Sequence, residues 1–365
     1  MSEIDNWPAW LPIRGQLRPL TAYGAPQVPA QARLNTNENP HGPSLELMAA
    51  IAKKIGIVAA NLNRYPDRDA IDLRTQIADY LNKQSGVKLQ VENVWAANGS
   101  NEILQSIFLA FGSGSALGFT PSYSMHSLIS RTTGVTWIKG EREPDFSLNV
   151  TSACQQILNS KPALTFVTTP NNPTGEAISI KDIEVLAKSV SSIKGLLVVD
   201  EAYAEFSSQP SAITLIDRYP NVVVTRTMSK AFAFAGARLG YMVANKVVID
   251  AIQLVRLPYH LSSLTQAAAE VAFDFQDELL AEVKNLVTAR EQLTNSLHDL
   301  GLKVAPSDAN FILFSGFKST SNQLWERLLA EGVLIRDVGL EGWLRVTIGN
   351  DAENKLFLNA LKGAL

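Results

Sequence analysis

Residues 195–200 read GLLVVD, a run of apolar side chains that ends in a carboxylate. Residues 196–199 are all Leu or Val, without any alternation between polar and apolar positions. A strand that is apolar on both faces is typical of a parallel sheet that helices cover on both sides. Residues 195–200 therefore predict a central strand of an α/β fold.

Similar runs recur along the chain, most clearly ALTFVTT at 163–169 and VVVTRT at 222–227. Further candidate strands lie at 94–97, 116–119, 135–138 and 239–244. The segments between them show helical spacing, as in 102–111, where Ile103 and Ile107 share a face. Strands that alternate with helices predict a large domain with a mostly parallel sheet of about seven strands, sandwiched by helices.

The pattern changes after residue 262. A long helical region is expected over 264–300, followed by short strands at 310–315, 333–338 and 343–349 and by helices near 320–331 and 352–363. We therefore expect a large ligand-binding domain over 44–262 and a smaller C-terminal α/β domain over 263–365. The proline-broken residues 1–43 show no clear element, and we expect them to form an arm that packs on the small domain or on a partner subunit.

Composition excludes several classes of protein. The 365 residues carry a formal net charge of -3, which argues against a nucleic-acid partner. The single cysteine and four unclustered histidines argue against a disulfide framework or a metal site. The acidic N-terminus lacks the pattern of a signal peptide, and no apolar run reaches membrane length. We expect a soluble cytoplasmic protein that binds neither metal nor membrane.

One glycine-rich segment resembles a dinucleotide-binding loop. GSGSALG at 112–118 has its third glycine one position late, and it lies between a predicted helix and the strand after it rather than between a strand and a helix. Nicotinamide chemistry is therefore not expected.

Polar residues follow several predicted strands. Ligands of open α/β sheets bind at the carboxyl ends of the strands, so these residues are candidates for one site. They are Ser100 and Asn101 in NGSNE, Tyr123 in TPSYSMH, Asn172 in PNNPTG, Asp200 and Tyr203 in VVDEAY, and Thr227, Ser229, Lys230 and Arg238 in TRTMSKAFAFAGARLG.

Each of these residues also has an ordinary structural explanation. Ser100 suits a helix cap, 172–175 suits a type I turn, Asp200 suits a cap, and an isolated lysine usually reaches solvent. One ligand explains them together, because pyridoxal 5′-phosphate has a phosphate, an aldehyde for Lys230, a ring nitrogen for Asp200 and a ring hydroxyl.

The ordered motifs NGSNE, PNNPTG, VVDEAY, TMSKAFAFAGARLG and WLRVTIG resemble the fold-type I pyridoxal-phosphate aminotransferases over nearly the whole chain. LNTNENPHGPS (34–44), NRYPD (63–67) and AYGAPQ (22–27) look like the histidinol-phosphate aminotransferases within that group. The resemblance implies an aspartate-aminotransferase-like fold and a homodimer with shared active sites.

The resemblance also implies a role for each matching residue. Lys230 would form the Schiff base and then move the Cα proton to C4′, while Asp200 would pair with the pyridine nitrogen. Asn172 and Tyr203 would contact the ring oxygen, and Tyr123 would stack on the ring. The remaining roles are cofactor phosphate binding by Ser100, Asn101, Thr227, Ser229, Arg238 and a partner's Tyr65, and substrate binding by Arg345 with Arg336, Tyr23 and Asn39.

The reaction that the resemblance implies converts L-histidinol phosphate and 2-oxoglutarate to imidazole acetol phosphate and L-glutamate, in histidine biosynthesis. Two rivals stay open: an aromatic amino-acid aminotransferase and a phosphoamino-acid decarboxylase. A third rival, a regulator that only senses cofactor, usually requires an attached DNA-binding domain, for which residues 1–43 are too short and too broken by proline. The first rival stays open because one arginine serves carboxylate or phosphate equally well. The sequence departs from many relatives at His260, where they have asparagine near the site, so selectivity is less firmly implied than cofactor chemistry.

Overall fold

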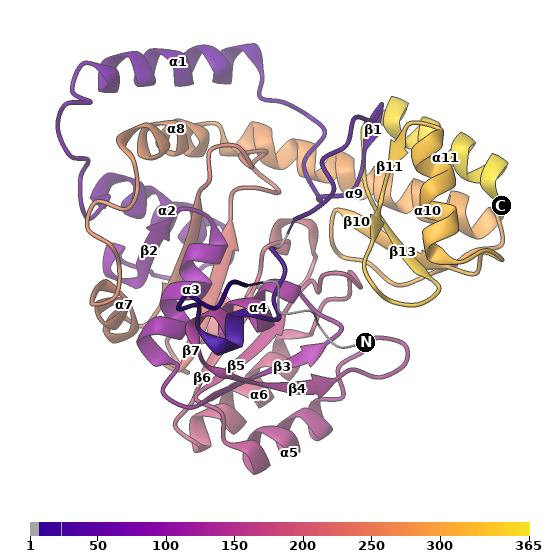
Figure 1. Cartoon of the computed structure of the whole chain (residues 1–365). Coiled ribbons are helices and arrows are strands. Elements are labelled where there is room, and N and C mark those ends of the chain that lie inside the picture. Colours follow the sequence, from indigo (N-terminus) through magenta and orange to yellow (C-terminus); the bar gives the residue numbers. More distant parts are fainter. Residues whose placement is uncertain (1–6, 23) are drawn as a thin grey trace.

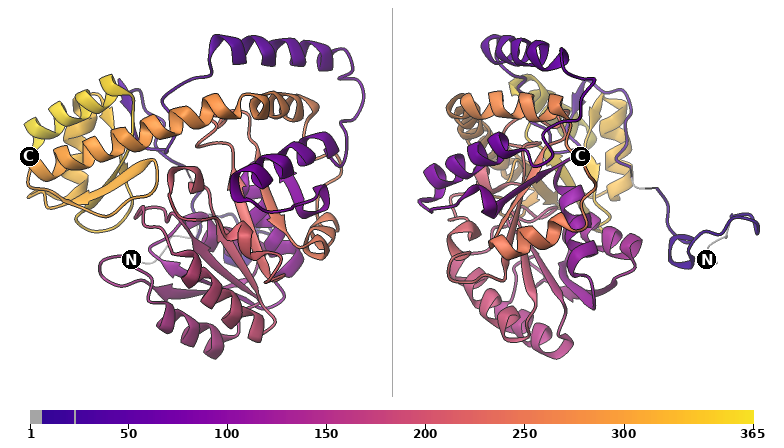
Figure 2. Two further views of the ribbon diagram at one scale, coloured as in Figure 1. Left: turned by 180° about the vertical axis from the view of Figure 1, so that it is seen from behind. Right: turned by 90° about the vertical axis from the view of Figure 1, so that its left-hand side faces the viewer.

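The structure is a computed structural model that describes residues 7–22 and 24–365. It contains a larger and a smaller lobe, each built on its own sheet (Figure 1). The long helix α9 (Gln276–Asp299) runs toward the smaller lobe, as the view from behind also shows (Figure 2). No helix in the described ranges is long and apolar enough to cross a membrane.

The larger lobe contains a seven-stranded sheet in the order β2-β8-β7-β6-β5-β3-β4. Only β8 is antiparallel to its neighbours, so the predicted mostly parallel sheet is confirmed. Its strands are β2 (Val94–Ala97), β3 (Ser115–Thr120), β4 (Thr136–Glu141), β5 (Leu164–Thr168), β6 (Leu196–Asp200), β7 (Val222–Thr227) and β8 (Gly240–Ala244).

Helices cover both faces of this sheet, which explains why its central strands are apolar throughout. On β6, Val198 joins the core that includes Ile103 and Ile107 of α3, whereas Val199 joins the core that includes Ile157 and Ile183 on the opposite face. The helices of this lobe are α1 (Leu45–Ala59), α2 (Ile71–Ser85), α3 (Ser100–Phe111), α4 (Ser124–Thr133), α5 (Val150–Ser160), α6 (Ile180–Ser192), α7 (Lys246–Gln253) and α8 (Ser263–Asp274).

The smaller lobe contains an antiparallel sheet in the order β12-β13-β10-β9 and a parallel pair β1-β11. Strand β1, from the predicted N-terminal arm, thus pairs with a C-terminal strand. The elements are β1 (Ala32–Arg33), β9 (Lys303–Val304), β10 (Phe311–Ser315), β11 (Val333–Leu334), β12 (Arg336–Asp337), β13 (Trp343–Thr347), α10 (Ser321–Ala330) and α11 (Asp351–Ala364).

Three local expectations differ from the structure. The helical region 264–300 is two helices, because the chain breaks at Phe275 between α8 and α9. The expected strand 333–338 is divided at Ile335 into β11 and β12, which belong to different sheets. The arm has short elements after all, the 3-10 turn Gly15–Leu17 and β1. The last two differences involve the pairing of β1 with the distant β11, which local spacing does not reveal.

The domain boundaries after residues 43 and 262 stay predictions. Around them, β1 pairs with β11 in the smaller lobe, and α8 packs on α1 and α2 in the larger one.

The register of the large sheet brings several strand ends to one edge. Thr168 at the end of β5 lies opposite Asp200 at the end of β6, and Thr227 at the end of β7 lies opposite Gly240. Because β8 is antiparallel, its first residue, Gly240, also lies opposite Ala97 at the end of β2. Residues far apart in sequence therefore meet along this edge.

Candidate active site

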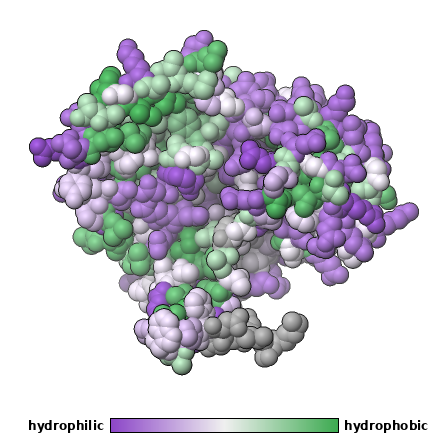
Figure 3. Space-filling model, turned by 45° about the horizontal axis from the view of Figure 1, so that its top comes forward, coloured by the Kyte–Doolittle hydropathy of each residue, from purple (hydrophilic) through white to green (hydrophobic). Residues whose placement is uncertain are grey.

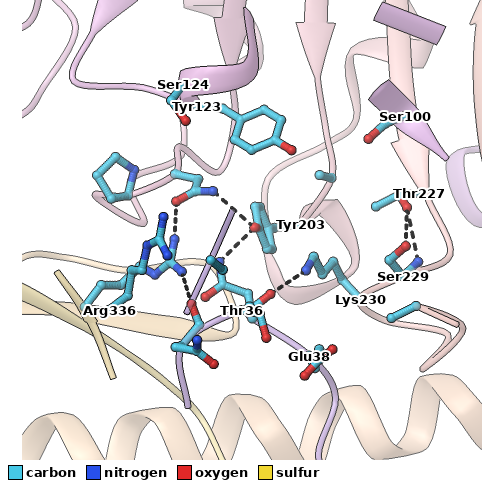
Figure 4. A pocket seen from close by; sticks show the side chains of 18 of the residues that line it. Thr36, Glu38, Ser100, Tyr123, Ser124, Tyr203, Thr227, Ser229, Lys230 and Arg336 are labelled. Atoms are coloured by element: carbon cyan, nitrogen blue, oxygen red, sulfur yellow. Dashed lines mark hydrogen bonds between the residues drawn. The ribbon is translucent and has the colours of Figure 1, made fainter. Parts of the chain in front are cut away.

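A cavity of about 620 Å³ lies at this edge of the large sheet, with the smaller lobe on its other side. The segment 35–38 of the N-terminal arm also lines it. Figure 4 shows side chains from both lobes pointing into the same space. The cavity brings together twelve predicted residues: Ser100, Asn101, Tyr123, Asn172, Asp200, Tyr203, Thr227, Ser229, Lys230, Arg238, Arg336 and Arg345.

Lys230 is partly buried in the wall of the cavity, just after β7. Its Nζ donates a 2.9 Å hydrogen bond to the backbone carbonyl of Thr36 (Figure 4). Burial lowers the pKa of Lys230 to about 8, helped by the positive charges of Arg345 and Arg238 and opposed by the carboxylate of Glu38. The amine is thus neutral at a lower pH than a solvated lysine, and a neutral amine is a nucleophile.

Asp200 ends β6 and is almost completely buried. Its Oδ2 lies 2.9 Å from Nε2 of His126, which is equally buried, so the histidine donates and the carboxylate accepts. Its Oδ1 has no hydrogen-bond partner among the described residues. A buried carboxylate oxygen without a donor is costly, so this atom is placed to accept a hydrogen bond from a ligand in the cavity.

The N-terminus of α3 forms one end of the cavity. Its cap, Gly99, has φ +81°, and a β-carbon there would lie 2.7 Å from the guanidinium of Arg238. A β-carbon on Gly240 would lie 2.4 Å from the backbone nitrogen of Ser100. These two glycines allow Arg238 and β8 to approach the first N–H groups of α3.

The hydroxyls of Thr227 and Ser229 lie 3.0 Å apart in the same wall of the cavity (Figure 4). Helix N-terminal N–H groups, hydroxyls and an arginine are groups of the kind that bind a phosphate.

Two arginines of the smaller lobe, Arg336 and Arg345, form the other charged part of the cavity. They lie directly opposite each other on β12 and β13. Arg345 donates to Oδ1 of Asn172 at 2.5 Å and to the carbonyl of Asn35 at 2.8 Å. In the described part of the chain, no hydrogen bond or ion pair joins the Arg336 guanidinium to another residue. Like charges that face each other across two strands are destabilising, so this pair is suited to a bound anion.

The polar wall between these two ends comes from Tyr203 and Asn172. The Tyr203 hydroxyl accepts hydrogen bonds from Nδ2 of Asn37, at 2.8 Å, and from Nδ2 of Asn172, at 3.5 Å. Tyr123 donates to Oδ1 of Asn101 at 3.2 Å. The expected type I turn at 172–175 is instead closed by a bond from Gly175 N to the carbonyl of Asn171, one residue earlier.

Two predicted residues are not placed in the cavity and a third lies outside the described residues, so the roles of all three stay predictions. The side chain of Asn39 accepts from the backbone N–H of His41. Tyr65 is 78% exposed, stacks on Tyr259 and does not line the cavity of its own chain. Tyr23 lies outside the described residues.

His260 does not line the cavity, although the sequence places it near the site. Its ring stacks on Trp95, and its Nε2 lies 2.9 Å from the carbonyl of Ala96. This histidine packs against β2, and its backbone carbonyl accepts a 2.7 Å hydrogen bond from Nδ2 of Asn98, beside the cap of α3.

The residues of the site that were not singled out in the sequence include His126, Thr36, Asn37 and Glu38. His126 follows Tyr123 by three residues, one helical turn into α4, and its ring contacts Asp200 rather than the cavity itself. The other three lie in LNTNENPHGPS, a motif that carried the resemblance without revealing which of its residues enter the site. Among the described residues, no group of three His, Cys, Asp or Glu side chains is arranged to hold a metal ion.

Comparisons with known proteins agree with this geometry. Residues 29–361 match the family described as Aminotransferase class I and II. The chain is 54% identical to the histidinol-phosphate aminotransferase of Mycobacterium sp. (strain JLS), over 96% of this chain and 93% of the relative. It is 55% identical to that of Nocardia farcinica, over 95% and 90%.

A solved structure gives the same fold. It is the histidinol-phosphate aminotransferase of Sinorhizobium meliloti in complex with pyridoxal-5′-phosphate, which matches with a TM-score of 0.85 and 24% identity over 98% of both chains. At that identity the match shows the fold alone, and the family follows from the motif-bearing residues 29–361 and the close relatives. The chain belongs to the class I and II aminotransferases.

Proposed function

We propose that this protein transfers an amino group between L-histidinol phosphate and 2-oxoglutarate, giving imidazole acetol phosphate and L-glutamate in histidine biosynthesis. The cofactor is pyridoxal 5′-phosphate. The observation that carries the proposal is that the cavity has the α3 N-terminus with Arg238 at one end and Arg336 with Arg345 at the other, with Lys230 between them (Figure 4). One end suits the cofactor phosphate, and the other suits the phosphate of histidinol phosphate or the carboxylate of glutamate.

The residues present fit this cofactor. Oδ1 of Asp200, which has no partner among the described residues, is available to accept a hydrogen bond from a protonated ring nitrogen. The N–H groups at the α3 end of the cavity are available to a phosphate. When bound, pyridoxal phosphate supplies an aldehyde for amines and a ring that accepts electrons from the substrate.

The protein's own residues then bind and orient the reactants. Ser100, Asn101, Thr227, Ser229 and Arg238 would hold the cofactor phosphate. Asp200, with His126 behind it, would keep the ring nitrogen protonated, because a buried carboxylate stabilises a nearby cation. Asn172 and Tyr203 would face the ring oxygen, and Tyr123 would cover the ring.

Lys230 would take the proton from the substrate Cα on Nζ and return it, since its lowered pKa suits proton transfer near neutral pH. Arg345 and Arg336 would bind the substrate anion. Asn39 and Tyr23 are proposed to assist them.

We further propose a cytoplasmic homodimer with shared sites, built from an N-terminal arm and the two domains 44–262 and 263–365. Exposed apolar side chains gather on α1, on the following loop and on 254–264, and Figure 3 shows hydrophobic surface over the α1 side of the molecule. They include Leu45, Met48, Ile57, Leu62, Tyr65, Ile71, Leu254, Leu257, Tyr259 and Leu264. A contiguous apolar surface of this kind marks a protein interface, and Tyr65 within it would reach the partner's cofactor phosphate.

The experiment that tests the proposed reaction compares amino donors in single half-reactions, by following the absorbance of the bound cofactor. We expect L-histidinol phosphate to convert the cofactor with a higher kcat/KM than L-phenylalanine, and 2-oxoglutarate to restore it. A preference for phenylalanine would identify an aromatic aminotransferase instead. Release of carbon dioxide without any need for 2-oxoglutarate would identify a decarboxylase.

A further inference from the structure

Asn37 lies between the two lobes, at the point where the N-terminal arm enters the cavity. It is 1% exposed, and its φ of +55° is in the left-handed region, which is uncommon for residues other than glycine. Its backbone carbonyl accepts from Nδ2 of Asn310 at 3.1 Å, and its N–H donates to the hydroxyl of Thr347 at 3.0 Å. The backbone of Asn37 is therefore fixed by two residues of the smaller lobe.

The orientation of the Asn37 side chain is also fixed. The Thr347 hydroxyl, which already accepts from the N–H of Asn37, donates its own proton to Oδ1 of Asn37 at 3.1 Å. The amide nitrogen must then point the other way, and it donates to the hydroxyl of Tyr203 at 2.8 Å (Figure 4). Asn37 thus connects a residue of β13 to Tyr203, which the proposed function places at the ring oxygen of the cofactor.

We infer that Asn37 is a positioning residue for Tyr203: its Nδ2–H occupies a lone pair of the Tyr203 oxygen and so directs the Tyr203 proton into the cavity, toward the cofactor oxygen. The inference rests on the proposed function. A hydroxyl oxygen that accepts a hydrogen bond is a stronger donor, because hydrogen bonds in a chain polarise one another. Asn37 would therefore strengthen a bond that it does not itself make.

The hydrogen bonds of Asn37 also connect the strand of Arg345 with Tyr203. Thr347, which fixes the Asn37 amide, lies two residues after Arg345 on the same strand. Thr36, which comes directly before Asn37 in the arm, accepts the hydrogen bond from Lys230. The strand that carries the proposed substrate arginine is thus joined through Asn37 to the group that faces the ring oxygen.

The test is the pH titration of the absorbance of bound pyridoxal phosphate, without any substrate. A proton donated to the cofactor oxygen favours the deprotonated form of the chromophore, so loss of that bond raises the midpoint. Asn37→Gly retains the left-handed backbone and removes only the side chain. We expect it to raise the midpoint by on the order of one unit, the equivalent of one hydrogen bond. Asn37→Asp is the second variant, nearly isosteric, and its carboxylate would draw the Tyr203 proton away from the cavity and raise the midpoint further.

The Tyr203→Phe background separates an effect through Tyr203 from any other. Tyr203→Phe alone should raise the midpoint, and Asn37→Gly should then add no further shift. Equal shifts by Asn37→Gly in both backgrounds, or none in the wild type, would overturn the inference and leave the proposed function intact. If Tyr203→Phe itself leaves the midpoint unchanged, the proposed place of Tyr203 is wrong and the inference with it. If the protein binds no pyridoxal phosphate at all, the proposed function is the claim that fails.

Discussion

Two cations near the end of β7 have opposite surroundings: one is paired with carboxylates and the other is not. Arg226 is buried on the sheet, and its guanidinium donates to Glu201 at 2.8 Å and to Glu205 at 2.9 Å. Lys230, just after the strand, has a carbonyl as its hydrogen-bond acceptor, and two further cations face it. The carboxylates raise the pKa of Arg226, whereas burial lowers the pKa of Lys230.

The difference separates a structural cation from a reactive one. Arg226 is paired as buried charges in stable proteins are, so its removal should affect folding. Among the described residues, no carboxylate lies in hydrogen-bond contact with Lys230, which costs stability and leaves an amine that readily loses its proton. A buried amine with a lowered pKa is typical of active sites.

The largest expected effect is on catalysis at Lys230. Lys230→Ala should lower turnover by several orders of magnitude, because it removes both the amine that binds the cofactor and the group that moves the Cα proton. Lys230→Arg is the matched control that retains a cation, and it should be equally inactive since a guanidinium does not lose its proton. Single-turnover rates would measure both, and activity near the wild-type level in either variant would contradict the comparison.

The second prediction concerns stability and points the other way. Arg226→Met should lower the free energy of unfolding by about 3–5 kcal/mol, because two buried carboxylates lose their partner. Lys230→Met, tested in the same cofactor-free protein, should cause no loss, since it removes an amine that burial already penalises. Urea denaturation gives both values. Equal losses of unfolding free energy in the two variants would mean that Arg226 and Lys230 contribute equally to stability, against this prediction.

A third prediction tests the unpaired arginine of the smaller lobe. Arg336→Leu should reduce kcat/KM for histidinol phosphate by about 10-fold to 100-fold, the equivalent of one charge-assisted hydrogen bond. Stability of the cofactor-free protein should change by no more than about 0.5 kcal/mol, because Arg336 faces a like charge. The surface variant Arg218→Leu is the control, and its kcat/KM should equal that of the wild type.

The smallest effect is a pH dependence. The rate at which the cofactor-free protein captures pyridoxal phosphate should rise with pH and level off above a midpoint of about 8, the pKa of Lys230. Glu38→Gln should move the midpoint lower, because the Glu38 carboxylate raises this pKa. Stopped-flow absorbance gives the profile. A midpoint near 10.5, the value of a solvated lysine, would show that burial does not act on this amine.

The free energy of unfolding should also depend on pH through Lys230. Since the pKa of Lys230 is lower in the folded protein than in the unfolded chain, the unfolded chain binds more protons between pH 8 and 10.5. The stability cost of burying Lys230 therefore falls as the pH rises through that window, so the protein becomes more stable, and Lys230→Met should remove this dependence.

Residues of the larger lobe were more predictable from sequence than those that bridge the lobes. Asp200, Lys230 and Asn172 each follow an apolar strand, and the carboxyl ends of parallel strands share one edge, so local pattern was enough to bring them together. The seven strands of that sheet follow from the same pattern.

The remaining parts depend on contacts across hundreds of residues. Asn37 bonds to Tyr203, Asn310 and Thr347, and β1 pairs with β11. No periodicity in 32–38 predicts these partners. The division of 333–338 between two sheets has the same origin, because β11 is defined by its pairing with the distant Ala32.

The most direct test of the account is to reduce the holoenzyme with borohydride, which makes the bond between cofactor and protein permanent, and to map the modified peptide by mass spectrometry. We expect one phosphopyridoxyl group per chain, on Lys230. Modification of another lysine with Lys230 left unmodified, or no modified peptide at all, would contradict it.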